Sequence, residues 1–395
     1  MISLRNVLER LTLVNRPDAD VEVEEKTIES GLLRLPTELI LMIASSLPTP
    51  SAICLALCSR RLYYILGPGF WKSLHEEAPG VLLAFLSTLE KDLPQHFVCQ
   101  QCTRLHRVSA VKWPHRITRF RTSLGPRCTR RTFNYRLLYL SRYEIRYPHV
   151  QLAIKQHCCG TDIGFPLKAF KHLEVKHDRH QEITLLSVDA QIVSNELLMR
   201  SQTWFLLPWQ RRDRFICQVA EKPHRYSICL HTEIPRVLDR GLGPGLMRSS
   251  LDQLEAREKR SPEMMQCPYC WMDYTLQAID FGERGFAIIL TRWVNLGGGQ
   301  DYADAKWQSH VTLPRARHPH HLGDIRTAYE EQAELSLKEF TADNEVKLFS
   351  RRRTRLVHRG SDGFTWKFDR YKRWYLAPSG PPETSLWRFL RGFEE

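Results

Sequence analysis

Residues 32–66 read LLRLPTELILMIASSLPTPSAICLALCSRRLYYIL. This stretch decides the fold, because it predicts three short helices together with their starts and ends. Pro36 has a fixed φ and no N–H to lose, so it suits the first turn of a helix. Glu38 adds a negative charge at that end, which the helix dipole favours. Apolar side chains then recur at helical spacing, at Leu39, Met42, Ile43 and Leu47.

Two more helices follow in the same stretch. Thr49 suits an N-cap with Pro50 at the first helical position, and residues 52–58 are apolar without a polar face. Ser59 suits the cap of a third helix. A stretch of this length is too short to build a core of its own size. Part of its apolar surface must therefore be covered by the rest of the chain or by a partner.

The order of these residues is Leu35-Pro36-x-Glu38-Leu39-x-x-x-Ile43-x-x-x-Leu47, followed by Leu55, Leu57-Cys58 and Leu62-Tyr63. It resembles an F-box, the three-helix element that docks on the small Skp-type adaptor of cullin-based ubiquitin ligases. The resemblance implies an F-box at residues 32–70 that binds the adaptor through Leu35, Pro36, Leu39, Ile43, Leu47, Leu55 and Leu62. The alternative is an ordinary buried helical hairpin at the start of a domain.

The composition is that of a globular protein with excess positive charge. The chain has 395 residues and an apolar fraction of 43%, enough for one large or two to three modest domains. A formal charge of +13 is compatible with an anionic partner such as nucleic acid. The basic residues are mixed with acids, however, and the tight run is Arg351-Arg352-Arg353-x-Arg355. We interpret the charge as solvated basic surface.

The sequence also bears on the compartment. No apolar run approaches the about 20 residues that a membrane span needs, and Arg5, Glu9 and Arg10 interrupt any signal-peptide pattern. We expect the cytoplasm or the nucleus, with no membrane partner. The eleven cysteines are then free buried thiols or metal ligands rather than disulfides.

The predicted fold class is α+β, with an N-terminal three-helix F-box followed by a mixed helix and strand region that carries a zinc knuckle site. Five parts are expected along the chain: a flexible acidic tail at 1–31, the F-box at 32–70, linking helices at 71–94, a Cys-rich mixed α/β recognition domain at 95–315 and a basic C-terminal extension at 316–395. Helices are expected at 135–147, 164–175 and 328–340, and a surface insertion at 239–261. The β pattern covers 183–207, 226–230, 272–279 and 286–294, with a hairpin turn at 281–285.

Two Cys-x-x-Cys pairs stand out, Cys99-Gln100-Gln101-Cys102 and Cys267-Pro268-Tyr269-Cys270. Two intervening residues let both thiolates of a knuckle turn toward one ion, and two knuckles complete a tetrahedral Cys₄ site. Zinc suits thiolates and does no redox chemistry, so it can staple segments that share little core. We therefore predict one structural zinc site from Cys99, Cys102, Cys267 and Cys270, across 164 intervening residues.

Other ligands compete with this assignment. Cys229 and His231 lie upstream of the second knuckle, and they predict a site with one knuckle or a second, separate site. His106, Cys128 and the run His157-Cys158-Cys159 are available as well. The remaining alternative is buried free cysteines, because cysteine is among the most often buried residues.

A second resemblance comes from the order of short motifs around the knuckles. These motifs are Phe97-x-Cys-x-x-Cys-x-x-Leu105-His106, Cys-x-x-Cys-x-x-Asp273-Tyr274-x-Leu276, Gly282-Glu283-Arg284-Gly285, Thr291-x-Trp293 and Lys306-Trp307-x-Ser309-His310. They resemble a group of filamentous-fungal F-box proteins in which an N-terminal F-box precedes two Cys-x-x-Cys knuckles in a region of mixed helix and strand. The resemblance implies no particular target.

The sequence favours a protein that is not an enzyme. It lacks His-Glu-x-x-His, Gly-x-Ser-x-Gly and Gly-x-x-x-x-Gly-Lys. Asp273 could act as a general base beside a catalytic zinc, but a hydrogen bond to a knuckle amide or a capped turn is the favoured role. Gly297-Gly298-Gly299 is interpreted as a loop, and His318, His320 and His321 as part of a polar linker.

These observations predict a substrate-receptor subunit of a Skp/cullin/F-box ubiquitin ligase. Its partners are a Skp-type adaptor, through it a cullin, and an unknown target protein. The alternative is a zinc-containing nucleic-acid-binding protein, which the charge and the aromatic residues among Lys and Arg support, namely Trp366, Tyr371, Trp374 and Tyr375. A third hypothesis is an F-box protein that acts as a scaffold outside a ligase.

Overall fold

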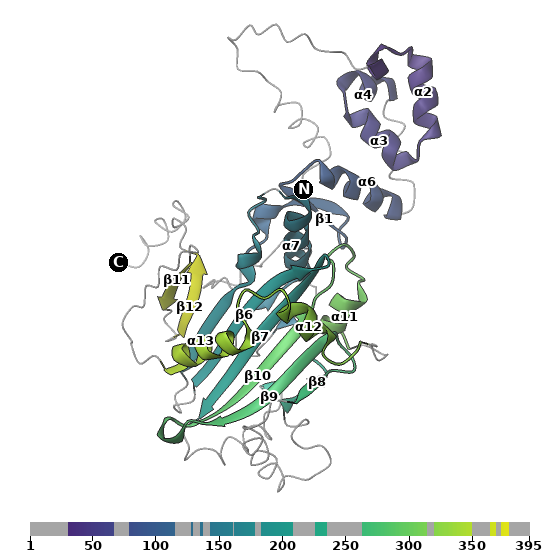
Figure 1. The fold of residues 1–395 in the computed structure, drawn as a ribbon. Helices are drawn as coiled ribbons and strands as arrows, with labels where there is room; N and C mark the ends of the chain where they lie inside the picture. The colour runs from purple at the N-terminus through teal and green to yellow at the C-terminus, as the bar shows by residue number, and fades with distance from the viewer. Residues whose placement is uncertain are drawn as a thin grey trace, which may run out of the picture. The chain divides into compact units, whose positions relative to one another are not determined.

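The computed structural model describes residues 31–66, 79–114, 128, 135–136, 143–160, 162–177, 183–207, 226–234, 263–313, 320–349, 364–368 and 373–378 (Figure 1). The chain divides into two compact units, Met1–Phe85 and Leu86–Glu395. The predicted acidic tail, apart from Gly31, and the predicted insertion at 239–261 lie outside the described residues.

The first unit contains the three helices that the capping signals predict. Its elements are η1 Gly31–Arg34, α2 Thr37–Ser46, α3 Thr49–Leu57 and α4 Arg60–Leu66. Pro36 and Pro48 are the N-cap residues of α2 and α3, each within one position of the predicted start. The Leu62 N–H donates to Ser59 Oγ at 3.1 Å, so Ser59 caps α4 as expected.

A small apolar core joins these helices. It consists of Ile40 and Ala44 from α2, Ala56 from α3, and Leu62 and Leu66 from α4. The Arg61 guanidinium donates to the carbonyl of Leu33, which ties η1 to α4. The three helices therefore bury one stripe of α2 and leave the rest of that helix outside their core.

The second unit is built on an eight-stranded sheet in the order β11-β12-β5-β6-β7-β10-β9-β8, with every neighbouring pair antiparallel. Its strands are β5 His172–His177, β6 Ile183–Val193, β7 Glu196–Leu207, β8 Met264–Gln266, β9 Met272–Asp280, β10 Phe286–Asn295, β11 Phe364–Phe368 and β12 Arg373–Pro378. Two small sheets pair β1 His96–Cys99 with β2 Arg104–Arg107, and β3 Tyr135–Arg136 with β4 Glu144–Ile145.

Four helices of this unit contribute side chains to the cores on the main sheet: α7 Tyr147–Cys159, α11 Ala305–Val311, α12 Asp324–Glu330 and α13 Leu337–Phe349. The helix α6 Pro79–Lys91 contains residues of both units. Short 3₁₀ turns occur at η2 Val108–Ala110, η4 Leu167–Phe170 and η8 Gly282–Arg284. Within the described ranges, no helix combines the length and the apolar character that crossing a membrane requires.

Two tight hairpins give the sheet its centre. The predicted β stretch at 183–207 is folded in half at Ser194-Asn195, where both residues have positive φ (51° and 61°) as a two-residue hairpin turn requires. The predicted turn at 281–285 is confirmed, since Asp280 pairs with Phe286 across it. The second hairpin therefore brings the end of the chain's second Cys-x-x-Cys knuckle beside β10.

Both faces of the sheet are covered. Alternate residues of β10, such as Ile288 and Leu290, join a large core that includes side chains of α7 and α11. Their neighbours Ile289 and Trp293 point to the opposite face, where side chains of α12 and α13 pack. Figure 1 shows α13 lying across the strands on that face. Burial on both faces explains why β10 is apolar almost throughout, with no alternation of polar residues.

Four predictions of secondary structure are wrong. The single helix predicted at 328–340 is interrupted, because α12 ends at Glu330 and α13 begins at Leu337. Residues 135–147 contain β3 and β4, and the helix begins only at Tyr147. Residues 164–175 contain the turn η4 and most of β5. Residues 226–230 form no regular strand and carry one isolated bridge, from Ser227 to Glu233. At 135–147 and 164–175, pairing with another strand overrides a weak preference for helix.

The predicted boundary at 315/316 is also wrong. α12 and α13 cover one face of the sheet, and β12 pairs with β5, so these parts of residues 316–395 belong to the second unit. The reason is that an apolar sheet face must be covered, and these helices cover it. Of the predicted linking helices at 71–94, α6 forms the later part, and residues 71–78 lie outside the described ranges.

Candidate functional site

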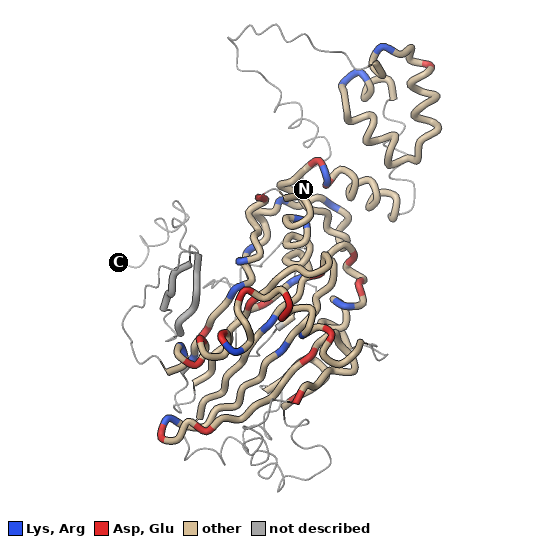
Figure 2. The backbone as a smooth tube through the Cα atoms, viewed as in Figure 1, with Lys and Arg blue, Asp and Glu red and all other residues tan. Residues whose placement is uncertain are grey.

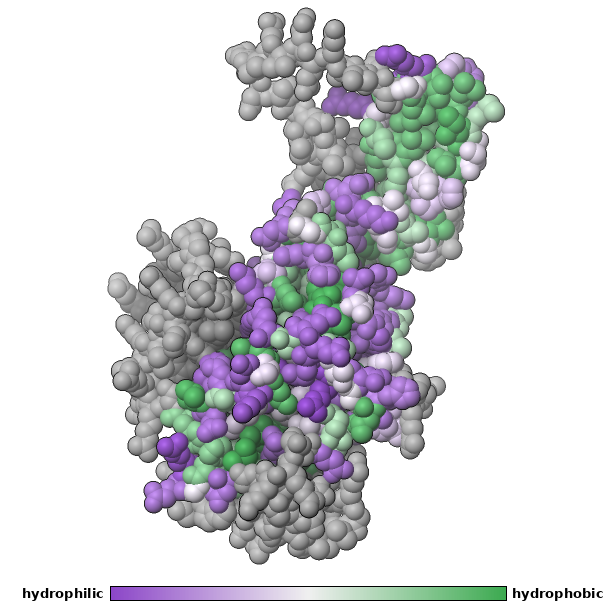
Figure 3. All heavy atoms as spheres, in the orientation of Figure 1, coloured by the Kyte–Doolittle hydropathy of each residue, from purple (hydrophilic) through white to green (hydrophobic). Residues whose placement is uncertain are grey.

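An apolar face of α2 is exposed to solvent. Met42 is 66% exposed and Leu39 is 42% exposed, whereas Ile40 and Ala44 on the other side of the helix are fully buried. Ile43 and Leu47 add to the exposed face, and Figure 3 shows hydrophobic residues gathered over this part of the first unit. Large exposed apolar patches on small domains mark interaction sites.

The predicted adaptor-binding residues fall into three groups. Pro36, Leu39, Ile43 and Leu47 are exposed. Leu35 and Leu55 are half-buried and pack against the core of the first unit. Leu62 is 1% exposed and belongs to that core, so the prediction that it contacts a partner is wrong. An apolar residue near the end of such a stretch is needed to hold three helices together, and sequence spacing does not separate that role from docking.

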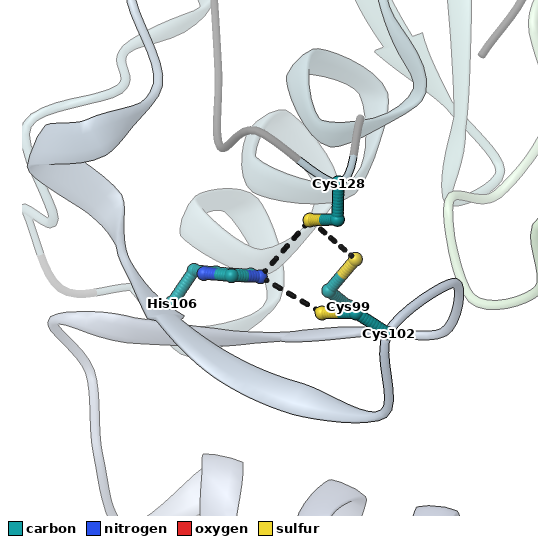
Figure 4. Close-up of side chains that lie close together, drawn as sticks. All are labelled: Cys99, Cys102, His106 and Cys128. Carbon is teal, nitrogen blue, oxygen red and sulfur yellow. Dashed lines mark hydrogen bonds between the residues drawn. The ribbon is translucent and has the colours of Figure 1, made fainter. Parts of the chain in front are cut away.

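The first knuckle closes a candidate metal centre, which we call centre 1: Cys99, Cys102, His106 and Cys128 (Figure 4). Cys99 ends β1, Cys102 lies in the turn, and His106 stands on β2 opposite Phe97. The His106 Nε2 atom lies 3.1 Å from Cys102 Sγ and 3.2 Å from Cys128 Sγ. Cys128 Sγ is 3.6 Å from Cys99 Sγ.

Two long side chains hold β1 against α7. Lys155 of α7 pairs with Glu90 at 3.1 Å, and its ammonium also donates to the carbonyl of His96 at 2.5 Å. Gln151 donates to the carbonyl of Val98 at 2.9 Å. Gln100, inside the knuckle, accepts from the N–H of Tyr302 and thereby connects centre 1 to the loop before α11.

The second knuckle belongs to a different centre, which we call centre 2: Cys229, His231, Cys267 and Cys270. Cys267 and Cys270 are fully buried just before β9. Cys229 Sγ lies 3.6 Å from Cys267 Sγ, and His231 Nδ1 lies 3.8 Å and 3.7 Å from the sulfurs of Cys229 and Cys267.

Centre 2 has an outer shell of the kind that metal sites use. The His231 Nε2 atom faces the carbonyl of Thr312 at 3.3 Å, which leaves Nδ1 directed at the sulfurs. The backbone N–H groups of Tyr269 and His231 each donate to a ligand sulfur at 3.4 Å. These contacts set the ring orientation and stabilise thiolates.

The donor atoms fit a tetrahedral ion in both centres. Zinc–sulfur bonds of about 2.3 Å in a tetrahedron separate two sulfurs by about 3.8 Å. One sulfur pair in each centre is 3.6 Å apart, and all four donor atoms of each centre lie within 4.8 Å of one another. Each centre can therefore hold a metal ion, and a set of three thiols and one imidazole suits a metal that prefers sulfur.

The pKa values of the two thiols of each knuckle are shifted in opposite directions. Burial raises the pKa of Cys99, but hydrogen bonds from His106 and Cys128 outweigh it and lower that pKa to about 7. Burial and the neighbouring Cys99 raise the pKa of Cys102. In centre 2, hydrogen bonds from Cys229 and Cys270 lower the pKa of Cys267, while the pKa of Cys270 is raised by its bonds to the same two partners Cys229 and Cys267. A cation would let both thiols of each knuckle ionise.

The predicted single site from Cys99, Cys102, Cys267 and Cys270 is therefore corrected to two centres with one knuckle each. The alternative ligands Cys229 and His231 occupy the positions that a second, separate site requires. The two further ligands of each knuckle are closer to it in sequence than the other knuckle is. For centre 2, the sequence signal is the short Cys229-x-His231 spacing. Cys158 and Cys159 are exposed at the end of α7, outside both groups.

Other candidates of the sequence have structural roles here. Asp273 accepts from the N–H groups of Ile325 and Arg326 at 3.0 and 3.1 Å, so it caps α12, in line with its favoured role. Gly299 has a φ of 65° and lies so close to the backbone of Gln151 that a Cβ would clash. The glycine loop therefore packs against α7.

The residues behind the nucleic-acid alternative are not described. Arg351 to Arg355 and Tyr371 lie outside the described residues, and so do the side chains of Trp366, Trp374 and Tyr375. Where the chain is described, Figure 2 shows basic and acidic residues mixed along the backbone. This distribution is consistent with a solvated charged surface.

Comparison with known proteins gives one finding. The family model of the F-box domain matches residues 32–73, which include the three helices and the exposed face of α2. F-box domains typically bind Skp-type adaptors in cullin complexes. No curated protein and no solved structure matches the chain.

Proposed function

We propose that this chain, an F-box protein by its match at residues 32–73, is the substrate-receptor subunit of a Skp/cullin/F-box ubiquitin ligase. The observation that carries the proposal is the exposed apolar face of α2 within the matched segment, from Leu39 to Leu47. Because the three helices leave this apolar face exposed, the apolar surface of a partner protein can pack against it.

In this function the F-box binds the adaptor and the second unit binds a target protein. The chain itself is not an enzyme, because catalysis belongs to its partners. It raises the effective concentration of the target near the ubiquitin-loaded enzyme and orients it there. The eight-stranded sheet of the second unit, covered on both faces, is a suitable frame for a recognition surface.

The proposal includes zinc at both centres. Three thiols with one imidazole are a structural zinc donor set, and such a set leaves no open position for a substrate. Zinc would then stabilise the second unit rather than take part in chemistry. We extend the proposal to the cytoplasm or the nucleus, where the free thiols that form both centres stay reduced.

Binding to a purified Skp-type adaptor tests the docking face. We expect a Met42→Asp/Ile43→Asp variant to bind at least about tenfold more weakly, since charges would replace two apolar contacts. Val346→Asp is the matched control, because Val346 is 70% exposed but lies in the second unit, on α13. Equal binding by wild type and the α2 variant would remove the support for the proposed function.

Co-purification with a cullin separates the receptor from a scaffold outside a ligase. We expect the wild-type chain to bring down both adaptor and cullin from a cell extract, and the α2 variant to bring down neither. Adaptor without cullin would favour the scaffold. Binding of the isolated chain to nucleic acid, with a steep loss as salt rises, would instead favour the nucleic-acid alternative.

A further inference from the structure

Arg292 is a buried cation beside centre 2. It stands on β10, is 1% exposed, and belongs to the sheet face that carries the cysteines of this centre. One arm of its guanidinium, Nη2, donates to Thr203 Oγ1 at 2.7 Å. The other, Nη1, donates at 3.2 Å to the carbonyl of Ile228, the residue directly before the ligand Cys229.

Centre 2 has a charge that needs compensation once a metal is bound. Three thiolates and a neutral imidazole around a divalent cation sum to one negative charge. Cys267 and Cys270 are fully buried, so little water screens this charge. An isolated buried charge is costly, and its cost falls when an opposite charge lies beside it. Arg292 supplies one positive charge at that position.

We infer that Arg292 is the counter-charge of the metal-bound centre 2 and that it positions the segment that carries Cys229 through the Ile228 carbonyl. Arg292 touches no metal, so it is a positioning residue. Burial is the largest effect on Arg292 and lowers its pKa, whereas Tyr135 and the ligand Cys229 act in the opposite direction and favour the charged guanidinium. The loaded centre and the guanidinium therefore stabilise each other inside one core.

Centre 1 provides an internal reference in the same molecule. Its ligands Cys102, His106 and Cys128 are half-buried, so water can screen its charge. Arg104 and Arg107, its neighbours on β2, are exposed. Removal of Arg292 should therefore affect centre 2 and leave centre 1 unchanged.

The inference depends on the proposed binding of zinc at centre 2. The experiment uses the full chain loaded with zinc, a metal chelator, and mass spectrometry of alkylated thiols. The peptides that contain Cys99 and Cys267 report on the two centres separately in one sample. We expect Arg292→Met to lose zinc from centre 2 about 10- to 100-fold faster than wild type, at an unchanged rate for centre 1.

Two variants separate charge from hydrogen bonding. Arg292→Lys keeps the positive charge, and Thr203→Val removes a neutral acceptor of Arg292 while it keeps the charge. We expect both to release zinc from centre 2 within a few-fold of wild type. Release from Arg292→Lys as fast as from Arg292→Met would overturn the inference.

A charge-matched double variant completes the test. Cys229→His makes the donor set of centre 2 two thiolates and two imidazoles, which with zinc is neutral. In that background, Arg292→Met should no longer accelerate the release of zinc from centre 2. If the single Arg292→Met variant does not fold, the double variant with Cys229→His should fold. An undiminished effect of Arg292→Met in the Cys229→His background would refute the counter-charge. Absence of zinc from wild-type centre 2 would instead refute the proposed function of the centre.

Discussion

Centre 1 and centre 2 have the same donors, three thiols and one imidazole, but they lie in different surroundings. Centre 1 closes a small hairpin of β1 and β2, and three of its four ligands are half-buried. Centre 2 lies in the main core beside β9 and β10, with two ligands fully buried. The difference teaches that one kind of ligand set can either hold a local turn or join distant segments of a core.

The largest expected effect is the loss of centre 2. Cys267→Ser should lower the free energy of unfolding of the second unit by at least about 3 kcal/mol, because the binding energy of a structural metal is folding energy. Cys99→Ser should cost about half as much, since centre 1 is more peripheral. Chemical denaturation followed by intrinsic tryptophan fluorescence measures both. Cys158→Ser, outside both centres and exposed, is the control, and equal losses at the two centres would contradict the comparison.

Chelation should distinguish the two centres by rate. Half-buried ligands are reached more easily, so we expect zinc to leave centre 1 at least about tenfold faster than centre 2. Hydrogen exchange should then increase first in residues 96–107, while β9 and β10 stay protected until the second phase. A single phase that releases both ions together would show that the centres do not differ in this way. Adaptor binding by α2 should survive the first phase.

A smaller effect is expected from the support of centre 1. The side chain of Gln100 donates to the carbonyl of Gln300 and accepts from the N–H of Tyr302, both at 2.6 Å. Gln100→Ala should lower stability by about 1 to 2 kcal/mol, because it removes both bonds. The neighbouring Gln101 is exposed in the same turn, so Gln101→Ala should change stability little. If the two variants behave alike in thermal unfolding, the connection from the knuckle to this loop contributes nothing.

The smallest expected effect concerns backbone strain, and it has the opposite sign. Thr103 follows the first knuckle with a φ of 48°, which is unfavourable for a β-branched residue. Trp271 follows the second knuckle, and it is not among the described residues with positive φ. Thr103→Gly should therefore raise stability by about 1 kcal/mol and slow zinc release from centre 1, as measured by alkylation of Cys99. Destabilisation by this variant would show that the Thr103 side chain matters more than its backbone conformation.

Local features were predictable where a short segment contains the capping or turn residues that determine its conformation. The helix starts near Pro36 and Ser59 follow from the fixed φ of proline and from capping, whereas α3 begins at the predicted cap Thr49 itself, with Pro48 as its N-cap. The turn at 281–285 follows from its glycines and the flanking β pattern. Leu62 was misassigned, because one spacing of apolar residues is compatible with both an internal and an external contact.

Pairings between distant segments were not predictable in the same way. Each Cys-x-x-Cys pair was identified as a metal knuckle, but its partner ligands depend on which strands meet. Cys128 reaches the hairpin of His106 from outside it, and Cys229 reaches Cys267 through packing on the main sheet. Arg292 carries no sequence signal at all, since a charged residue in an apolar strand is notable only when its burial is known.

The amino-acid order alone was sufficient for the F-box helices, the mixed α+β class, the two Cys-x-x-Cys pairs as candidate metal ligands and the hairpin turn at 281–285, because residues close together in the chain mark each of them. Only the tertiary structure shows the division into two centres, the packing of α12 and α13 on the sheet, and the exposure of Met42 beside the burial of Ile40. These features depend on which apolar surfaces find each other. The packing of these surfaces reduces the exposed apolar area of the chain as a whole, so no single segment of the sequence predicts it.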